Sequence, residues 1–293
     1  MGYRPRRLAR HTTFAIRGLD HHLVEWGPKS DDPVLLLHGY ADCAETFQFV
    51  ADEIEPELPL VALDWRGFGG SARSPCGYWF PDYYADLEAL LDRICPGKPA
   101  RLVGHSMGAN VAMVYAGVRP ARVRALVNLE GFGLRRTNPS QAPARLARWL
   151  DELRQPGQPT AYANVAELAA RIVQRNPRLP ADRAAFIAEC WSAPAPGGGV
   201  QLRTDPAHRR LNPYLYRREE MEACWRCIEA RVLLVVGHES DLGAELAAEG
   251  GVDMFRRFVR ELAIERVAGA GHMLHHEAPQ AVARLIESFA GVS

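Results

Sequence analysis

Five short apolar runs set the main pattern of the chain. Their apolar residues follow one another instead of alternating with polar ones, and glycine, proline or charged residues bound each run. Such runs are typical of strands that are buried on both faces of a parallel sheet. They lie at residues 34–37, 60–63, 101–103, 125–129 and 232–236.

A hairpin is predicted ahead of these runs. Residues 12–16 and 21–26 alternate apolar and polar side chains, and Gly18 and Asp20 lie between the two stretches. This alternation predicts two antiparallel strands joined by a tight turn.

Helical patterns separate the apolar runs. The final one is the clearest, because Pro279 stands near its first turn and apolar residues from Val282 to Phe289 share one face. Earlier helical patterns lie at 44–54, 83–94 and 107–118. Strands that alternate with helices after an opening hairpin predict an α/β fold with a mostly parallel, doubly wound sheet.

The alternation of strand and helix breaks between residues 134 and 228. This stretch has no apolar strand runs. It has amphipathic helical patterns and then a loop rich in proline and glycine, at 144–153, 165–175, 181–191 and 194–199. So long an insertion between two sheet strands predicts a helical lid. We expect a core domain in two parts, 1–133 and 229–293, with a helical cap at 134–228.

Composition and charge exclude several classes of protein. The 293 residues are 47% hydrophobic and 24% charged, as in folded globular proteins. Basic and acidic residues both number 35, so the formal net charge is zero and no overall field attracts nucleic acid or an anionic membrane. The N-terminus lacks an apolar stretch of signal-peptide length, and no run of about 18 apolar residues occurs. We expect a cytoplasmic protein that binds neither nucleic acid nor membrane, and no pattern specifies an oligomeric state.

The six cysteines are expected to be reduced, because the chain is long and has no export signal. Cys224 and Cys227 form a CxxC pair, but no second CxxC and no histidine pair stands at zinc spacing. We interpret both as ordinary thiols and expect no metal site.

The strongest chemical signal is the pentapeptide Gly104-His-Ser-Met-Gly108, which follows one predicted strand and precedes a predicted helix. A nucleophile that points out of so sharp a turn sits in strained backbone, and side chains two residues away would clash unless they were glycine. We therefore interpret Ser106 as a nucleophile. A serine that only capped the helix would not require both glycines.

A serine hydroxyl needs a base, and His272 is the candidate. It lies after a predicted strand at 263–267 and before the final helix, where a loop brings an imidazole over the carboxyl edge of the sheet. His275 and His276 are rivals, but they fall at the start of that helix and are interpreted as solvent-exposed or capping residues.

The base needs an acid that fixes its tautomer and stabilises the imidazolium. The order serine, acid, histidine along the chain favours Asp241, which follows the strand at 232–236. Glu130 is the alternative acid, because it ends the preceding sheet strand.

Two backbone N–H groups are expected to stabilise the oxyanion. One belongs to Met107, the residue after the nucleophile, and the other to Tyr40 in the loop after the strand at 34–37. Gly39 lets the backbone turn closely there, and His38 is interpreted as a buried hydrogen-bonding residue.

Four successive motifs of the chain resemble the signatures of the α/β-hydrolase family. They are His38-Gly39, Asp64-Trp-Arg66-Gly67-Phe-Gly69-Gly-Ser71, Gly104-His-Ser-Met-Gly108 and Gly271-His272. The resemblance runs from about Arg10 to the C-terminus and implies a serine esterase-like member with a helical lid. It also implies that Asp64 and Arg66 belong to a structural turn. Asp241 stands one residue later after Gly237 than the commonest family spacing, which keeps Glu130 open as the acid.

The triad and the resemblance imply two-step acyl transfer on a small-molecule ester, with no metal or organic cofactor. A carbon–carbon bond hydrolase and a cofactor-free perhydrolase keep the same serine and stay open, as does a non-catalytic ligand-binding protein on the same fold. Aromatic lid residues either line an apolar pocket or pack the lid onto its own domain. These residues are Trp149, Tyr162, Phe186, Trp191, Tyr214 and Trp225.

Overall fold

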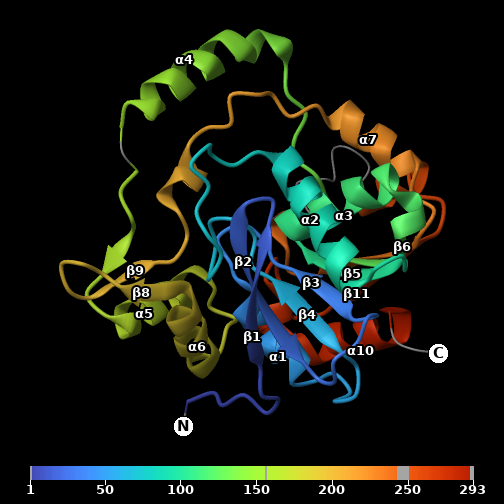
Figure 1. Ribbon diagram of the computed structural model, residues 1–293, viewed down its shortest axis with the longest axis horizontal. Helices are drawn as coiled ribbons and strands as arrows, with labels where there is room; N and C mark the ends of the chain where they lie inside the picture. The colour runs from blue at the N-terminus through green and yellow to red at the C-terminus, as the bar shows by residue number, and fades with distance from the viewer. Residues whose placement is uncertain (1, 156, 243–250, 291–293) are drawn as a thin grey trace.

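The computed structural model describes residues 2–155, 157–242 and 251–290, and its centre is an eight-stranded sheet (Figure 1). The strand order is β1-β2-β4-β3-β5-β6-β10-β11. β2 pairs antiparallel with β1 and with β4, and every other pair is parallel. The strands are β1 (Arg10–Ile16), β2 (Leu19–Trp26), β3 (Val34–Leu37), β4 (Leu60–Leu63), β5 (Ala100–His105), β6 (Val123–Leu129), β10 (Arg231–Gly237) and β11 (Leu262–Val267). This is the mostly parallel, doubly wound sheet that the sequence predicts.

The apolar runs form the central strands of the sheet. They are apolar at nearly every position because a layer of helices covers each face of the sheet. Every residue of β3 is buried. Leu35 and Leu37 face one apolar cluster while Val34 and Leu36 face the other, since successive side chains of a strand point to opposite faces. β11 lies at the edge of the sheet, and most of its residues are partly or fully exposed.

Helices cover both faces of the sheet (Figure 1). One face carries α2 (Phe80–Ile94), α3 (Met107–Val118) and α7 (Arg218–Arg226). The other carries α1 (Gln48–Ala51), α9 (Leu274–Glu277) and α10 (Pro279–Ala290). The helix predicted at 44–54 is shorter than expected, because a 3₁₀ turn (Ala44–Phe47) precedes the single turn of α1. Further 3₁₀ turns lie at Pro120–Arg122, Pro139–Gln141, Pro206–Arg209 and Val252–Arg257.

The segment between β6 and β10 contains the three helices that the sequence predicts. It also contains three short strands that the sequence does not predict. The helices are α4 (Ala142–Leu153), α5 (Val165–Arg175) and α6 (Ala181–Trp191). A small antiparallel sheet of β7 (Ala161–Tyr162), β9 (Val200–Leu202) and β8 (Ser192–Pro194) joins them. The sequence does not reveal these strands, because strands of two or three residues are too short to show a period.

The inserted helices differ in how they are packed. α5 and α6 pack with Phe49 of the core in a third apolar cluster. α4 stands away from the sheet as an arch (Figure 1), and it buries none of its residues. Among the described residues, no helix is long and apolar enough to cross a membrane.

Candidate active site

The candidate residues gather at the carboxyl edge of the parallel strands. Ser106 directly follows β5 and Glu130 directly follows β6. Asp241 lies four residues after β10, and His272 lies in the loop between β11 and α9. Because parallel strands end at the same edge, their following loops meet there, which is where ligands bind in open α/β sheets.

Ser106 occupies a sharp turn between β5 and α3. Its φ of 48° and ψ of −109° are unfavourable for any residue with a side chain. A Cβ on Gly104 would lie 2.5 Å from Ala109 Cα, and a Cβ on Gly108 would lie 2.2 Å from the carbonyl oxygen of Leu37. Both flanking positions therefore exclude a side chain. Ser106 makes no side-chain capping hydrogen bond to α3, so a helix-capping role does not account for it.

His272 is supported by a buried carboxylate. Its Nδ1 lies 3.2 Å from Oε2 of Glu130, whose side chain is fully buried. Oε1 of Glu130 accepts the N–H of Gly237 at 2.7 Å, and Oε2 accepts the hydroxyl of Ser240 at 2.5 Å. These donors fix the carboxylate so that it faces the imidazole. The φ of Glu130 is 61°, a second strained position at this edge.

Asp241, the acid that chain order favours, is not the carboxylate bound to the imidazole. Its side chain is exposed, and among the described residues no hydrogen bond or ion pair joins it to His272. In the loop after β10, the residue that contacts the Glu130 side chain is Ser240, whose hydroxyl donates to Oε2. The carboxylate against His272 is therefore the alternative, Glu130.

Ser106 and His272 lie on adjoining loops. His105 donates through Nε2 to the backbone oxygen of His272 at 2.9 Å, and the two rings lie 4.8 Å apart between centroids. Within the described part of the chain, no hydrogen bond joins Ser106 Oγ to His272. Such bonds are often long in ligand-free sites and tighten when substrate binds.

The two candidate oxyanion donors flank Ser106. Met107 is the first residue of α3, so its N–H has no acceptor within the helix. Tyr40 follows Gly39, where an added Cβ would lie 2.7 Å from His105 Nδ1 and 3.2 Å from Ser106 Cβ. Neither amide donates to another backbone group among the described residues. Both are available to a ligand at this edge.

His38 is a hydrogen-bonding residue of the core. It is fully buried, its Nε2 accepts the N–H of Trp65 at 3.0 Å, and its Nδ1 donates to the Gly39 oxygen at 2.7 Å. With both ring nitrogens occupied, it fixes the loop that carries Tyr40.

Asp64 and Arg66 hold the turn after β4. Asp64 accepts the N–H groups of Ala44 and Gly70, each at 2.7 Å. Arg66 makes two hydrogen bonds of 2.6 Å to Asp86. These contacts build a rigid turn, in agreement with the role that the resemblance implies.

His275 and His276 are not solvent-exposed or capping residues. Both are almost fully buried and face the carboxylate of Asp42. The expectation was wrong because α9 packs against α1 and the 3₁₀ turn at Ala44–Phe47 instead of lying on the surface. Sequence reasoning also missed Asp42, whose only local signal is its place four residues after His38.

Burial and neighbouring charges shift the pKa values of this histidine cluster. Burial raises the pKa of Asp42, but the nearby His276 and His275 outweigh it and hold that pKa well below its ordinary value. Burial and the neighbouring His276 lower the pKa of His275 to about 4. Burial, His275 and His272 also hold the pKa of His105 well below its usual range, so His105 is neutral.

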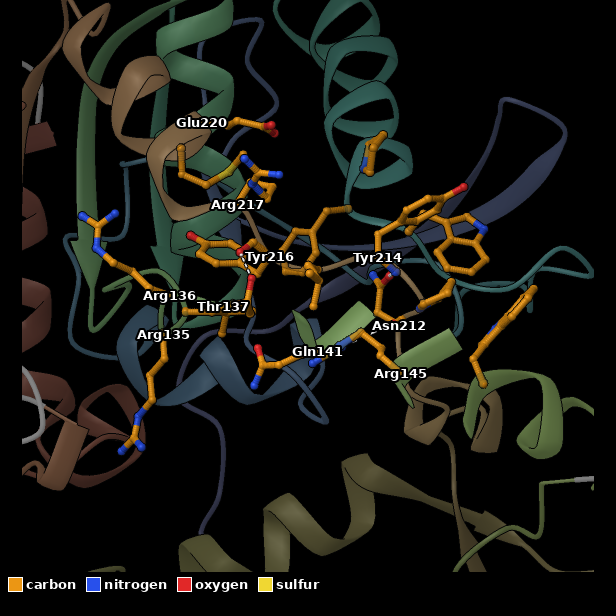
Figure 2. Close-up of a pocket in the computed structure, with 18 of the residues that line it drawn as sticks. Arg135, Arg136, Thr137, Gln141, Arg145, Asn212, Tyr214, Tyr216, Arg217 and Glu220 are labelled. Carbon is orange, nitrogen blue, oxygen red and sulfur yellow. Dashed lines mark hydrogen bonds between the residues drawn. The ribbon is translucent and has the colours of Figure 1, made fainter. Parts of the chain in front are cut away.

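A cavity of about 1070 Å³ lies between α4, which forms an arch in Figure 1, and the segment before α7, and Figure 2 shows its lining side chains. Arg145 and Trp149 of α4 form its outer wall, and Tyr214 and Tyr216 from the segment before α7 form part of its inner wall. Ser106, Glu130 and His272 are not among its lining residues.

The inner wall of the cavity approaches the first turn of α3. A Cβ on Gly133 would meet the hydroxyl oxygen of Tyr216 at 2.9 Å. The N–H of Gly133 donates to Asn110 Oδ1 at 2.8 Å, and the backbone N–H of Asn110 donates to the backbone carbonyl oxygen of Ser106 at 2.9 Å. A series of contacts through Gly133 and Asn110 thus links Tyr216 of the cavity wall to the turn of Ser106.

The aromatic lid residues divide between the cavity and the packing of the lid. Trp149 and Tyr214 line the cavity. Tyr162, Phe186 and Trp191 pack in the cluster of α5 and α6, and Trp225 is buried against the sheet. Both interpretations of these aromatics therefore hold, each for a different subset.

Comparisons with known proteins agree with this geometry. The family model described as alpha/beta hydrolase fold matches residues 32–279. The chain is 26% identical over 281 residues to a serine hydrolase-like protein of Danio rerio, covering 90% of this chain and 83% of the relative. It is 26% identical over 262 residues to the 2-(acetamidomethylene)succinate hydrolase of Mesorhizobium japonicum, covering 89% of each. Among solved structures, the thioesterase domain from the curacin biosynthetic pathway is similar with a TM-score of 0.82 and 26% identity, covering 95% of this chain and 99% of that one.

Proposed function

This chain belongs to the alpha/beta hydrolase fold family, and on that premise we propose that it is a serine hydrolase that cleaves carboxylic esters of small or medium apolar substrates through an acyl-enzyme. The observation that carries the proposal is the strained turn of Ser106 beside a histidine that a buried carboxylate supports. Backbone strain persists only where the surrounding structure enforces it, and it clusters at functional sites.

The first half of the reaction forms the acyl-enzyme. His272 Nε2 takes the proton of Ser106 Oγ as the oxygen attacks the ester carbonyl. Glu130 holds Nδ1–H, which leaves Nε2 free to accept the proton, and its negative charge stabilises the imidazolium. The same imidazolium then gives its proton to the departing alcohol.

The amides of Tyr40 and Met107 hold the oxyanion of the tetrahedral intermediate. One such donor typically contributes about 2.7–4 kcal/mol of transition-state stabilisation. In the second half, His272 removes a proton from water, which attacks the acyl group, and the imidazolium then returns the proton to Ser106 Oγ as the acid leaves.

The cavity under α4 supports a substrate with an apolar part. Its walls include Phe80, Trp149 and Tyr216, which offer aromatic surface to an acyl or alkyl chain. Arginines such as Arg145 also line it. The Mesorhizobium japonicum relative is named for a succinate derivative, so esters that carry a free carboxylate belong in a substrate panel beside neutral ones.

The test compares Ser106→Ala with wild type on p-nitrophenyl esters of graded chain length. We expect the variant to lose at least about 10⁴-fold in kcat/KM with an unchanged circular dichroism spectrum. Ser288→Ala is the matched control, because this serine is exposed on α10. Turnover that survives in Ser106→Ala would defeat the assignment.

Two further arms of the experiment separate the alternatives. The same triad serves carbon–carbon bond hydrolysis and perhydrolysis, so vinylogous diketones, and acetate with hydrogen peroxide, are assayed beside the esters. A fluorophosphonate probe should label wild type and not Ser106→Ala. A wild-type protein that stays unlabelled would favour a non-catalytic binding role instead.

A further inference from the structure

A second group of reactive side chains lies away from Ser106, between the loop after β3 and α9. Oδ2 of Asp42 lies 3.1 Å from His275 Nε2 and 3.4 Å from His276 Nε2. One possible ligand atom from each of the three residues lies within 4.8 Å of the other two. The three side chains are 0–2% exposed, so water does not solvate them.

Hydrogen bonding accounts for only one of the two contacts with Asp42, in which His275 Nε2 donates to Oδ2 at 3.1 Å. His276 Nε2 has no hydrogen-bond partner although it faces the Asp42 carboxylate, and His275 Nδ1 has none either. Buried polar atoms in folded proteins are almost always paired. His276 Nε2 is therefore an unpartnered buried nitrogen directed into the cluster.

The separations of Asp42 Oδ2 from the two imidazole nitrogens fit one tetrahedral metal ion. Two ligands bonded to zinc at about 2.0–2.1 Å lie about 3.3–3.4 Å apart, and the two measured separations are 3.1 and 3.4 Å. Imidazole nitrogens with one carboxylate form a donor set for Zn²⁺, whereas Mg²⁺ and Ca²⁺ prefer oxygen ligands. The fourth position would be filled by a single water molecule enclosed with the ion, since bulk solvent does not reach these side chains.

Surrounding donors already orient the carboxylate. Oδ1 of Asp42 accepts hydrogen bonds from Thr46 Oγ1 at 2.8 Å, from the Cys43 N–H at 2.9 Å and from Trp191 Nε1 at 2.9 Å. This leaves Oδ2 turned toward the histidines. Such outer contacts are the usual support of a metal-binding carboxylate.

We propose that Asp42, His275 and His276 bind one Zn²⁺ ion. The ion would join the loop after β3, which carries Tyr40, to α9, which begins two residues after His272. It would brace these two loops and take no part in the reaction of Ser106. The proposal stands on the cluster alone and does not depend on the proposed function.

A surface cluster provides the control. His11 Nδ1 lies 3.0 Å from His22 Nε2 and 3.9 Å from Glu45 Oε1, and these atoms also meet the spacing for a metal ion. His11 is exposed, and His22 Nδ1 is bonded to Asp64 at 2.7 Å. The contact between the two rings is already a hydrogen bond, so this cluster has no unpartnered nitrogen to explain.

The experiment loads chelator-treated protein with ZnCl₂, removes excess metal by gel filtration and measures zinc by mass spectrometry and Tm by scanning fluorimetry. We expect about one zinc per chain and a Tm higher by roughly 5 °C in wild type and in His11→Gln. His276→Gln should lose both, because it removes one ligand and no hydrogen bond. A chain without zinc, or zinc retained in His276→Gln and lost in His11→Gln, would overturn the proposal.

A second measurement keeps the proposal testable if His276→Gln does not fold. The zinc X-ray absorption spectrum of loaded wild type should contain two imidazoles and light oxygen atoms. A sulfur shell would place the ion at the cysteines instead and refute the site. A tenfold excess of MgCl₂ should displace none of the zinc.

Discussion

Exchanging Glu130 for glutamine tests which carboxylate supports the catalytic histidine. Oε1 of Glu130 accepts the fixed N–H of Gly237, so the amide oxygen of the variant must stay there. The amide NH₂ then replaces Oε2, opposite Ser240 and His272. The Ser240 hydroxyl can rotate and accept a hydrogen bond from this NH₂. The His272 imidazole can accept one only if its Nδ1 carries no proton.

This change forces the wrong tautomer on His272. With its proton on Nε2, the imidazole can no longer accept the proton of Ser106, and no negative charge remains to stabilise the imidazolium. In Ser-His-Asp enzymes the matching carboxylate-to-amide change lowers kcat about 10⁴-fold. We expect a loss of about 10³–10⁴-fold, which is about 4–5 kcal/mol in the activation free energy.

The assay is the steady-state rate on the best p-nitrophenyl ester of the panel, with a thermal melt for each variant. Asp241→Asn is the matched control and should stay within about threefold of wild type, because the Asp241 side chain is exposed and does not contact His272. The reasoning is refuted if Asp241→Asn loses 10³-fold while Glu130→Gln keeps most of its activity.

Three further changes probe the turn, the cavity and the core. Gly108→Ala puts a Cβ 2.2 Å from a backbone oxygen and should lower the free energy of unfolding by at least about 3 kcal/mol in urea titrations. The control Gly197→Ala has open space around it and should change the free energy of unfolding by less than about 0.5 kcal/mol. Equal effects of the two changes would contradict the steric argument. Trp149→Ala removes part of the cavity wall and should raise KM for long-chain esters several-fold while KM for acetyl esters stays unchanged. The control Leu150→Ala, on the exposed side of α4, should leave KM for both kinds of ester unchanged. Burial raises the pKa of Asp86, but hydrogen bonds from a histidine and an arginine outweigh it and hold that pKa below its ordinary value. This group therefore stabilises the fold above its unfolded pKa, and the contribution is lost as pH falls below about 4. Asp86→Asn should cost about 3–5 kcal/mol at pH 7, because it removes the two short hydrogen bonds of the buried Arg66 guanidinium and leaves that charge with only the longer ion pair to Asp82. It should also flatten the fall in stability between pH 5 and pH 3, and an unchanged slope would argue against the charge pairing.

The sequence by itself determined the core strands and the nucleophile turn. The runs at 34–37 and 60–63 coincide with β3 and β4, because a strand buried on both faces must be apolar at every position. The glycines around Ser106 could be identified for a similar reason. A side chain at either glycine would clash with the adjacent strand or with the first turn of α3, and any chain with this strand–turn–helix order must make these contacts.

Tertiary structure alone decided which acid faces the histidine. Chain order favours Asp241, but Glu130 and Asp241 both follow strands that end at the same edge, so position along the chain does not decide between them. The outcome depends on how the loop after β10 folds: Gly237 and Ser240 bind the carboxylate of Glu130, and Asp241 is left exposed.

The histidine cluster also required the folded chain. α9 is only four residues long, too short for a helical period to reveal which of its side chains are buried. Asp42 lies 233 residues from His275 along the chain, and nothing local links them. Patterns in the sequence record contacts between neighbours along the chain, whereas a carboxylate and two imidazoles from distant loops meet only when the packing of α9 against the core brings them together.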